Sequence, residues 1–206
     1  MLVSVLIPTI SERGEQFQKM SNKLYTQIKA NQVEIISICD NRTIPLSVKR
    51  NMLQKMSSGK YFVSLDDDDE FTDDFLKRVV THIESLDPNK YQDIIGYNQL
   101  AKVSGKRFIV KPHMEAGLLL IPCGNQLNPD MSVRKDVLPE FYRYPWQFNL
   151  WHEKFKKVYR TDSDTNAKED TNWLKKVQLE HPKTMSYIDF IGHVYNFDDP
   201  SLSSCQ

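Results

Sequence analysis

The stretch YFVSLDDDDEF, residues 61–71, places four consecutive carboxylates directly behind a short apolar run. The run YFVSL is typical of a strand inside a parallel sheet, because both faces of such a strand are buried. Two like charges about 4 Å apart near a protein surface repel by on the order of 4 kcal/mol, and a bound cation turns this repulsion into attraction. The stretch therefore predicts a buried strand that delivers carboxylates to a cation.

Two similar apolar runs precede this strand, LVSVLI at residues 2–7 and VEIISIC at residues 33–39. Apolar residues at helical spacing follow each of the three runs. Strands that alternate with helices predict an α/β fold, with an open, mostly parallel sheet and helices on both faces. Ligands of such sheets bind beyond the carboxyl ends of the strands. Three polar segments follow the strands there, at residues 8–13, 40–43 and 66–69.

The second half of the chain is less regular. The segments DIIGYN, RFIVK, GLLLIP and MSYIDFIGHVYNF indicate further strands, some of them antiparallel. Residues 169–179 carry Trp173, Leu174 and Val177 at helical spacing, which predicts a helix. The polar segment RTDSDTNAKED, residues 160–170, is typical of a mobile loop.

Composition favours one compact domain and gives no overall charge signal. The chain has 206 residues, 40% of them hydrophobic, and its 27 Lys and Arg balance its 27 Asp and Glu. Cys39, Cys123 and Cys205 are far apart and form no C-x-x-C pair, which favours a reducing compartment over a disulfide or zinc scaffold. The apolar opening stops at Pro8, too short for a membrane span or a signal peptide. We therefore expect a cytoplasmic protein without a membrane span.

The phosphate-binding motifs of other nucleotide proteins are absent. The chain has seven glycines and contains neither G-x-G-x-x-G nor G-x-x-x-x-G-K-[ST], which excludes the dinucleotide-binding and P-loop sites. A calcium loop is also excluded, because Phe71 and Lys77 stand where its glycine and closing glutamate are needed. Helix capping explains Asp73 and Asp74 but not the four carboxylates before them. One or two carboxylates with phosphate oxygens suit Mg²⁺ or Mn²⁺.

Four motifs in order resemble the glycosyltransferases of family 2, which have the GT-A fold. They are VSVLIPTISER, DNRTIPLSVKRNMLQKMSSGKYFVSLDDDDEFTDDFL, LNPDMSVRKDVL and KEDTNWLKKV, and together they span most of the chain. The block from DNR to LDDDD is the most specific part. The resemblance implies one Rossmann-like GT-A domain over residues 1–206, with a small antiparallel part on the acceptor side. Residues 1–100 would bind a nucleotide-sugar and residues 101–206 an acceptor.

The resemblance also implies where the donor binds. The turn after the first strand would line the base pocket, and Asp40 would accept a hydrogen bond from the ring N–H of uracil, which suits a UDP-sugar. Arg50, in VKRN, would approach the base or the diphosphate. The implied donor-binding residues are Pro8, Thr9, Glu12, Asp40, Arg50, Asp66 and Asp67.

Some of these residues have a simpler interpretation. Without the motifs, Asp40 would be assigned to a surface turn and Arg50 to a solvated helix face. We expect neighbouring Lys49 on such a solvated face.

The implied metal is Mn²⁺ or Mg²⁺. Asp68, the last carboxylate of the D-x-D, would hold it together with Asp66. His193, in GHVYNF, is a candidate third ligand, although a lone histidine on a strand is more often simply packed in the core. The histidine that the family often has in HLNP is replaced here by Gln126, so any role for it is absent.

The family places its general base at the aspartate of KED, here Asp170. Inverting transfer needs a base that removes the proton of the acceptor hydroxyl as its oxygen attacks the anomeric carbon. A carboxylate at a helix N-terminus is stabilised as the anion, which weakens it as a base. The alternative is that Glu169 and Asp170 only cap the helix.

The segment FYRYPWQFNLWHEKFKKVYR, residues 141–160, is the candidate acceptor surface. Eight of its twenty residues are aromatic, and five are basic against one acid. Aromatic faces stack on sugars and bases, and basic residues bind phosphates. We expect about half of these aromatics in the core. If the others are exposed, a glycan or a hydroxymethylated base in DNA would suit them as the acceptor, and the sequence does not separate the two.

Two classes of function remain open from the sequence. The favoured one is a metal-dependent inverting glycosyltransferase that uses a nucleotide-sugar. The alternative is a non-catalytic nucleotide-sugar or glycan-binding module on the same scaffold. A nucleotidyltransferase is disfavoured, because the glycine-rich N-terminal loop with Arg and Lys that it needs is missing.

Overall fold

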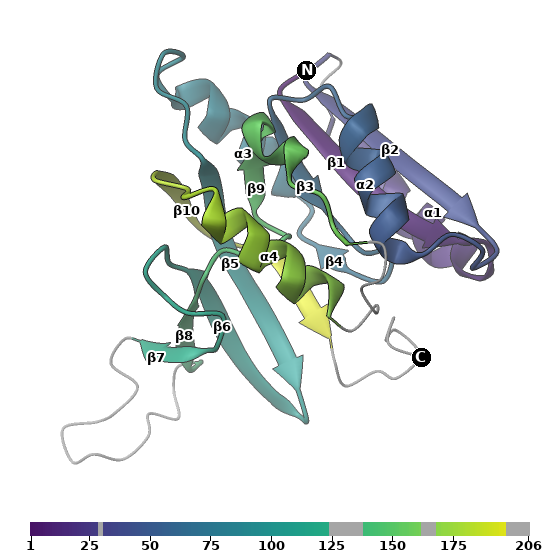
Figure 1. Cartoon of the computed structure of the whole chain (residues 1–206). Coiled ribbons are helices and arrows are strands. Elements are labelled where there is room, and N and C mark those ends of the chain that lie inside the picture. The colour runs from purple at the N-terminus through teal and green to yellow at the C-terminus, as the bar shows by residue number, and fades with distance from the viewer. Residues whose placement is uncertain (29–30, 124–137, 162–167, 197–206) are drawn as a thin grey trace.

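A computed structural model describes residues 1–28, 31–123, 138–161 and 168–196 (Figure 1). Within these residues the strands form one sheet of ten strands, in the order β2-β1-β3-β9-β5-β6-β8-β7. Strand β10 also pairs with β5, and β4 pairs with β10. The fold class predicted from the sequence, a mostly parallel α/β sheet with helices on both faces, is confirmed.

The first half of the chain builds the parallel part of the sheet. Strands β1 (Val3–Ile10), β2 (Val33–Asp40) and β3 (Tyr61–Ser64) are parallel, with β1 in the centre. The register pairs Ile10 with Asp40, so the polar segments that follow β1 and β2 start at the same edge of the sheet. Each of the three strands matches an apolar run of the sequence.

Helices cover the two faces of this sheet because successive strand residues point to opposite faces. Helices α1 (Gly14–Tyr25) and α3 (Phe75–Ser85) pack in one core with Val5. Helices α2 (Leu46–Met56) and α4 (Glu169–Leu179) pack in the other core with Leu6, and both lie on the viewer's side of the sheet in Figure 1.

The second half adds the mixed part of the sheet. Strand β5 (Ile94–Val103) is parallel to β10 (Met185–Asn196) and antiparallel to β6 (Lys106–Pro112). Ser104 and Gly105 join β5 to β6 with φ values of 51° and 71°, as a tight type I′ hairpin requires. Strand β9 (Leu150–His152) lies between β3 and β5, antiparallel to both, and joins the two halves of the sheet.

Three short strands were not predicted from the sequence. They are β4 (Glu70–Phe71), β8 (Glu140–Arg143) and β9. Each has two to four residues, too few to show a periodic pattern, and each forms where a distant strand offers unpaired backbone groups. The expected strand GLLLIP is wrong over most of its length, because β7 is only Ile121–Cys123.

Some sequence predictions fall on residues outside the described ranges. These include most of the motif LNPDMSVRKDVL with Gln126, most of the expected loop at residues 160–170, and Cys205. The division into halves at residue 100 stays a prediction. Among the described helices, none combines the length and the apolar character that crossing a membrane requires.

Candidate active site

A cleft of about 180 Å³ lies beyond the carboxyl ends of β1 and β3, beside the N-terminus of α2. One wall is apolar and includes Ile44 and Leu46, while Arg13, Arg42 and Lys49 supply positive charge. An apolar wall suits a flat nucleobase, and cations suit phosphates. Of the predicted donor-binding residues, Pro8, Thr9, Asp66 and Asp67 line this cleft, whereas Glu12, Asp40 and Arg50 do not.

Asp40 holds the wall of the cleft in place from behind. Its Oδ2 accepts hydrogen bonds from the backbone N–H of Ile44 at 2.6 Å and from Thr43 at 3.0 Å, and its Oδ1 is paired with Lys49. The hydrogen bond from Lys49 is the largest of the effects that hold the pKa of Asp40 well below its usual range. A contact between Asp40 and uracil stays a prediction.

Lys49 does not lie on a solvated helix face, so that expectation is wrong. Its side chain is 4% exposed, and its Nζ donates to the carbonyl oxygen of Thr9 at 2.8 Å as well as to Asp40. The charge of Asp40 compensates the burial of the lysine, because buried charges need partners. Lys49 therefore ties the end of β1 to the end of β2.

Glu12 lies at the exposed rim of the cleft. Its Oε2 is 2.8 Å from Nη2 of Arg42, and both side chains are more than half exposed. Arg42 itself lines the cleft, so Glu12 is connected to the site through its ion pair with Arg42.

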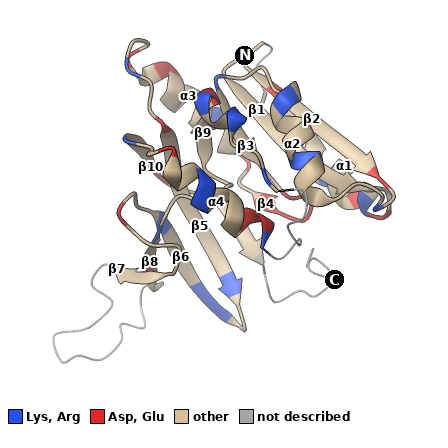
Figure 2. Cartoon of the chain, in the orientation of Figure 1, with Lys and Arg blue, Asp and Glu red and all other residues tan. Residues whose placement is uncertain are grey.

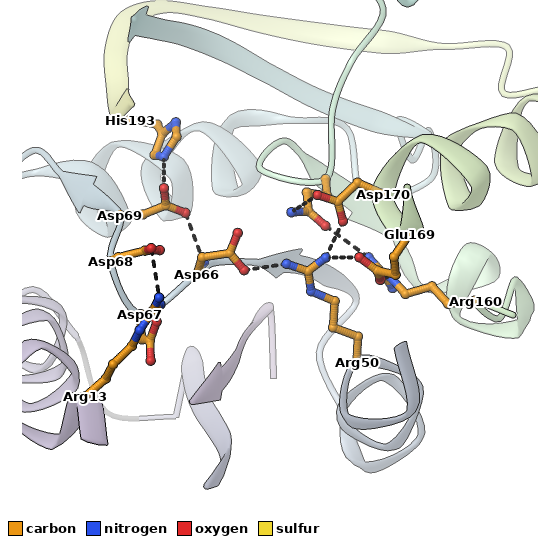
Figure 3. Close-up of polar contacts among 11 residues, drawn as sticks. Arg13, Arg50, Asp66, Asp67, Asp68, Asp69, Arg160, Glu169, Asp170 and His193 are labelled. Carbon is orange, nitrogen blue, oxygen red and sulfur yellow. Dashed lines mark hydrogen bonds and ion pairs between the residues drawn. The ribbon is translucent and has the colours of Figure 1, made fainter. Parts of the chain in front are cut away.

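The four carboxylates of the acidic cluster, Asp66 to Asp69, point in different directions and contact different partners (Figure 3). Asp67 accepts hydrogen bonds from Thr9 and Arg13, both at 2.7 Å, and Asp68 lies 3.2 Å from the same guanidinium nitrogen of Arg13. Asp69 turns away and accepts from the backbone N–H of Asp66 at 2.9 Å. Thus Arg13, which was not among the predicted site residues, is the main cation of the cluster on the cleft side.

The cluster still carries an excess of negative charge. Burial, followed by the nearby charges of Asp66 and Asp69, raises the pKa of Asp68 to about 7. A carboxylate in this state gains from a further cation, and hard carboxylate oxygens suit Mg²⁺ or Mn²⁺. Among the described residues, no three His, Cys, Asp or Glu side chains are grouped so as to hold a metal ion. The fit is therefore limited to one or two carboxylates, with phosphate oxygens and water completing the shell.

His193 is poorly placed as a metal ligand. Its Nδ1 accepts a hydrogen bond from the amide of Gln99 at 2.8 Å, and its Nε2 lies 2.8 Å from Oδ1 of Asp69. The ring is fully buried and stacks on Phe148 with the centroids 4.3 Å apart. Because both ring nitrogens are engaged, a metal would have to displace one of these contacts. The packed interpretation fits His193 better.

Arg50 is the centre of a buried ionic network (Figure 3). Its side chain is 2% exposed and pairs with Asp66 through Nη2 and with Glu169 and Asp170 through Nη1. Arg50 is therefore not on a solvated face, and its guanidinium is committed to three carboxylates rather than to the cleft. It links the end of β3, where Asp66 lies, to the start of α4.

Asp170 faces this network from the first turn of α4. One of its oxygens is paired with Arg50, and the other accepts a hydrogen bond from the amide of Gln147 at 3.0 Å. Burial raises the pKa of Asp170 well above its usual range, opposed by the charge of Arg50. Burial therefore acts against the weakening that the helix N-terminus is expected to cause. Figure 2 shows acidic residues at the start of α4 and beside β4.

Glu169 plays a different part from its neighbour. It is fully buried between Arg50 and Arg160. Burial alone would raise the pKa of Glu169, but the two guanidinium charges outweigh it and hold the pKa below its usual value. Glu169 thus remains charged and fixes the start of α4.

The aromatic segment 141–160 is divided between core and surface, as expected. Trp151 and Phe155 are buried in the core with α4, whereas Tyr142 and Tyr159 are exposed. Between them, the guanidinium carbon of Arg143 lies 3.6 Å from the centroid of the ring of Trp146. Trp146 directly precedes Gln147, so this stacked pair lies next to the partner of Asp170.

Sequence reasoning missed Arg13, Asp69, Glu169, Arg160 and Gln147 as members of the site. Arg13 follows the first strand and stands in a quoted motif, so its position offered a signal. Gln147 and Arg160 lie in an irregular segment, and only the tertiary structure brings them to α4.

The comparisons agree with this geometry. The family model described as glycosyl transferase family 2 matches residues 41–107, about a third of the chain, including Arg50 and the acidic cluster. No curated protein matches.

Solved structures of S. aureus TarS have the same fold. One matches with a TM-score of 0.64 and 15% identity, over 95% of this chain and 37% of that chain. TarS 1-349 in complex with UDP gives 0.64 and 15%, over 95% and 60%. The complex with UDP-GlcNAc gives 0.62 and 16%, over 100% and 62%. At this identity the likeness shows the fold, and the chain spans less than two thirds of each of these structures.

The resemblance to family 2 glycosyltransferases with the GT-A fold is therefore confirmed. The family model supports it over the segment that carries the acidic cluster, and the TarS structures show the same fold.

Proposed function

We propose that this protein is an inverting glycosyltransferase that moves a sugar from a nucleotide-diphosphate sugar to a hydroxyl acceptor. The observation that carries the proposal is the placement of a cation-lined cleft and a partly buried carboxylate, Asp170, around one ionic network. Asp66 lines the cleft and pairs with Arg50, and Arg50 pairs with Asp170. A donor in the cleft and a base at Asp170 would thus share a single rigid support.

A UDP-sugar is the favoured donor. The apolar wall would contact the base, and Arg13 and Arg42 would neutralise the diphosphate. TarS has been solved with UDP and with UDP-GlcNAc, which makes a uridine donor the natural first candidate for this chain.

Asp68 and Asp66 are the residues that would hold Mn²⁺ or Mg²⁺. Such an ion supplies positive charge to the departing diphosphate. The raised pKa of Asp68 supports this assignment, because it reflects burial first and then the negative charges of Asp66 and Asp69, both of which a bound cation would offset. His193 is not needed for it.

Asp170 would act as the general base. The acceptor oxygen attacks the anomeric carbon, the bond from that carbon to the diphosphate oxygen breaks, and the hydroxyl proton passes to the carboxylate of Asp170. A raised pKa makes the ionised carboxylate a stronger base. The charge of Arg50 favours the ionised form of Asp170 and opposes the effect of burial.

The acceptor would lie along the stacked pair of Arg143 and Trp146. A planar cation on an aromatic ring offers a flat face to a sugar or to a base, which suits both a glycan and a hydroxymethylated base in DNA. A cytoplasmic location stays a prediction.

The test compares wild type, Asp68→Ala and Asp170→Asn with UDP-sugars and Mn²⁺. We expect hydrolysis or transfer by wild type and a loss of about 10²- to 10⁴-fold in Asp170→Asn, the usual contribution of a general base. UDP binding by calorimetry should persist in Asp170→Asn and weaken in Asp68→Ala.

Asp73→Asn is the matched control, because Asp73 is 93% exposed and pairs only with Lys23 among the described residues. It should behave as wild type. UDP binding without turnover in wild type would instead indicate a nucleotide-sugar-binding module. Retained turnover in Asp170→Asn would remove the base from Asp170.

A further inference from the structure

Gln147 is a buried amide that the reaction described above does not use. It lies between β8 and β9 and is 1% exposed. Its backbone carbonyl accepts a hydrogen bond from the N–H of Ser64, at the end of β3, at 3.3 Å. The backbone of Gln147 is thereby fixed to the strand that leads to the acidic cluster.

The side chain of Gln147 closes a ring of polar contacts. Its Nε2 donates to Oδ2 of Asp170 at 3.0 Å, and its Oε1 accepts from Nη2 of Arg160 at 3.2 Å. Arg160 pairs with Glu169, Glu169 with Arg50, and Arg50 with Asp170. Because a guanidinium can only donate, Arg160 forces the amide to turn its oxygen toward itself and its N–H toward Asp170.

The backbone of Arg160 is held by hydrogen bonds to the side chain of Asn51. Its N–H donates to the amide oxygen of Asn51 at 2.8 Å, and its carbonyl accepts from the amide nitrogen of Asn51 at 2.9 Å. Asn51 follows Arg50 on α2, so both guanidinium groups of the ring are anchored to the same helix.

We propose that Gln147 is a positioning residue that aims the carboxylate of Asp170. This inference rests on the proposed function of Asp170 as the base. Arg50 holds one carboxylate oxygen and Gln147 holds the other, so the plane of the carboxylate is fixed at two points. With Arg50 alone, the group rotates about its terminal bond, and fewer conformers present an oxygen to the acceptor hydroxyl.

The N–H of Gln147 also favours the charged form of Asp170. A hydrogen bond to a carboxylate lowers its pKa, so removal of Gln147 raises the pKa of Asp170 further. The charged groups that act on Asp170 from the surrounding elements are Arg50, Glu169, Asp66, Arg143 and Arg160. Substitution of Gln147 leaves all of them in place.

The test is Gln147→Met, which keeps the length of the side chain and removes the donor. The kcat of transfer should fall about tenfold, the size of effect that a 1.4 kcal/mol change produces. The KM for the donor should not change, because Gln147 does not line the cleft. The acid limb of kcat/KM should move to higher pH, since the base of the variant has the higher pKa.

Gln54→Met is the matched control. Gln54 is also 1% exposed, lies on α2, and neither of its amide atoms has a hydrogen-bond partner among the described residues. The same chemical change there should leave kcat and the acid limb as in wild type. Gln147→Glu adds a negative charge beside Asp170 and should move the acid limb in the same direction, and farther.

A second measurement does not depend on turnover. Titration of carbon-13-labelled aspartate followed by NMR should give a higher pKa for Asp170 in Gln147→Met than in wild type. An unchanged acid limb together with an unchanged Asp170 titration would overturn the inference. If wild type has no turnover with any UDP-sugar, the proposed function fails, and the NMR titration alone decides whether Gln147 controls the charge of Asp170.

Discussion

The cations beside the cleft and Arg143, in the mixed half of the sheet, are held differently, although other cations of the mixed half, such as Lys111 with Glu140, do form ion pairs. In the parallel half, Lys49 pairs with Asp40, Arg13 with Asp67, and Arg50 with three carboxylates. In the mixed half, Arg143 stacks on Trp146 and donates its Nε to the carbonyl of Leu118. Among the described residues, no carboxylate forms an ion pair with Arg143.

This difference indicates two different roles for the positive charges. The ion pairs of the parallel half fix the shape of the cleft and the position of Asp170, because a buried ion pair holds its partners in one geometry. A cation stacked on an aromatic ring keeps its remaining N–H groups for another molecule. This contrast supports our proposal that the parallel half is a rigid donor site and that the Arg143 and Trp146 pair is the contact surface for the acceptor.

The largest expected effect on stability comes from removing Arg50, the centre of the ion pairs in the parallel half. Arg50→Met leaves the buried charges of Glu169 and Asp170 without their main partner, and loss of one member of a buried ion pair costs about 3–5 kcal/mol. Urea denaturation should show this loss in the free energy of unfolding. Arg78→Met is the control, because Arg78 pairs at the surface with Asp74. Equal losses in the two variants would show that the buried network is not needed for folding.

A smaller effect, on acceptor binding, is expected from the stacked pair of Arg143 and Trp146 in the mixed half. Arg143→Gln removes the cation over Trp146 and with it hydrogen bonds to the acceptor worth about 0.5–1.5 kcal/mol, so the acceptor KM should rise by up to about tenfold. Hydrolysis of the donor by water should not change, because Arg143 does not line the donor cleft. Kinetics with a glycan and with hydroxymethylated DNA would measure both quantities.

Arg107→Gln, an exposed arginine on β6, is the control for a general loss of charge. A change in donor hydrolysis in Arg143→Gln would place Arg143 with the donor site, and the comparison between the two halves would then be wrong.

The smallest effect on stability is expected from Asp40, at the end of β2 in the parallel half. Asp40→Asn replaces the carboxylate beside Lys49 by an amide whose oxygen can still accept from Nζ, so the fold should be destabilised by only on the order of 1 kcal/mol at pH 7. The pKa of folded Asp40 lies below its unfolded value of about 3.9, so its contribution is complete above that value and is lost as the pH falls further. Unfolding free energies from pH 7 to pH 3 should therefore converge between wild type and variant only below about pH 4. A constant difference would show that ionisation of Asp40 is not involved.

The parallel half of the sheet was largely predictable from the sequence. The three strands, their helices and the acidic cluster follow from local patterns of apolar and polar residues, and the carboxyl ends of parallel strands meet at one edge. The burial of Lys49 was not predictable, because a lysine on an amphipathic helix shows no local sign of the carboxylate on a neighbouring strand that will pair with it.

The mixed half could be predicted much less well. Strand β9 has three residues and no periodicity, and it forms because β3 and β5 both offer backbone partners to it. The contact of Gln147 with Asp170 joins residues that are 23 positions apart. No pattern within either segment indicates the other.

The sequence by itself determined the α/β architecture, the edge at which the site lies and the carboxylates available there, because these depend on periodicity and on the order of strands. Only the tertiary structure decided which charges are paired, since ion pairs such as Arg50 with Asp170 join distant segments. It also decided that His193 is packed in the core and that burial raises the pKa of Asp170. The strength of an ionic contact depends on how well both partners are shielded from water, and that shielding exists only once the chain is folded.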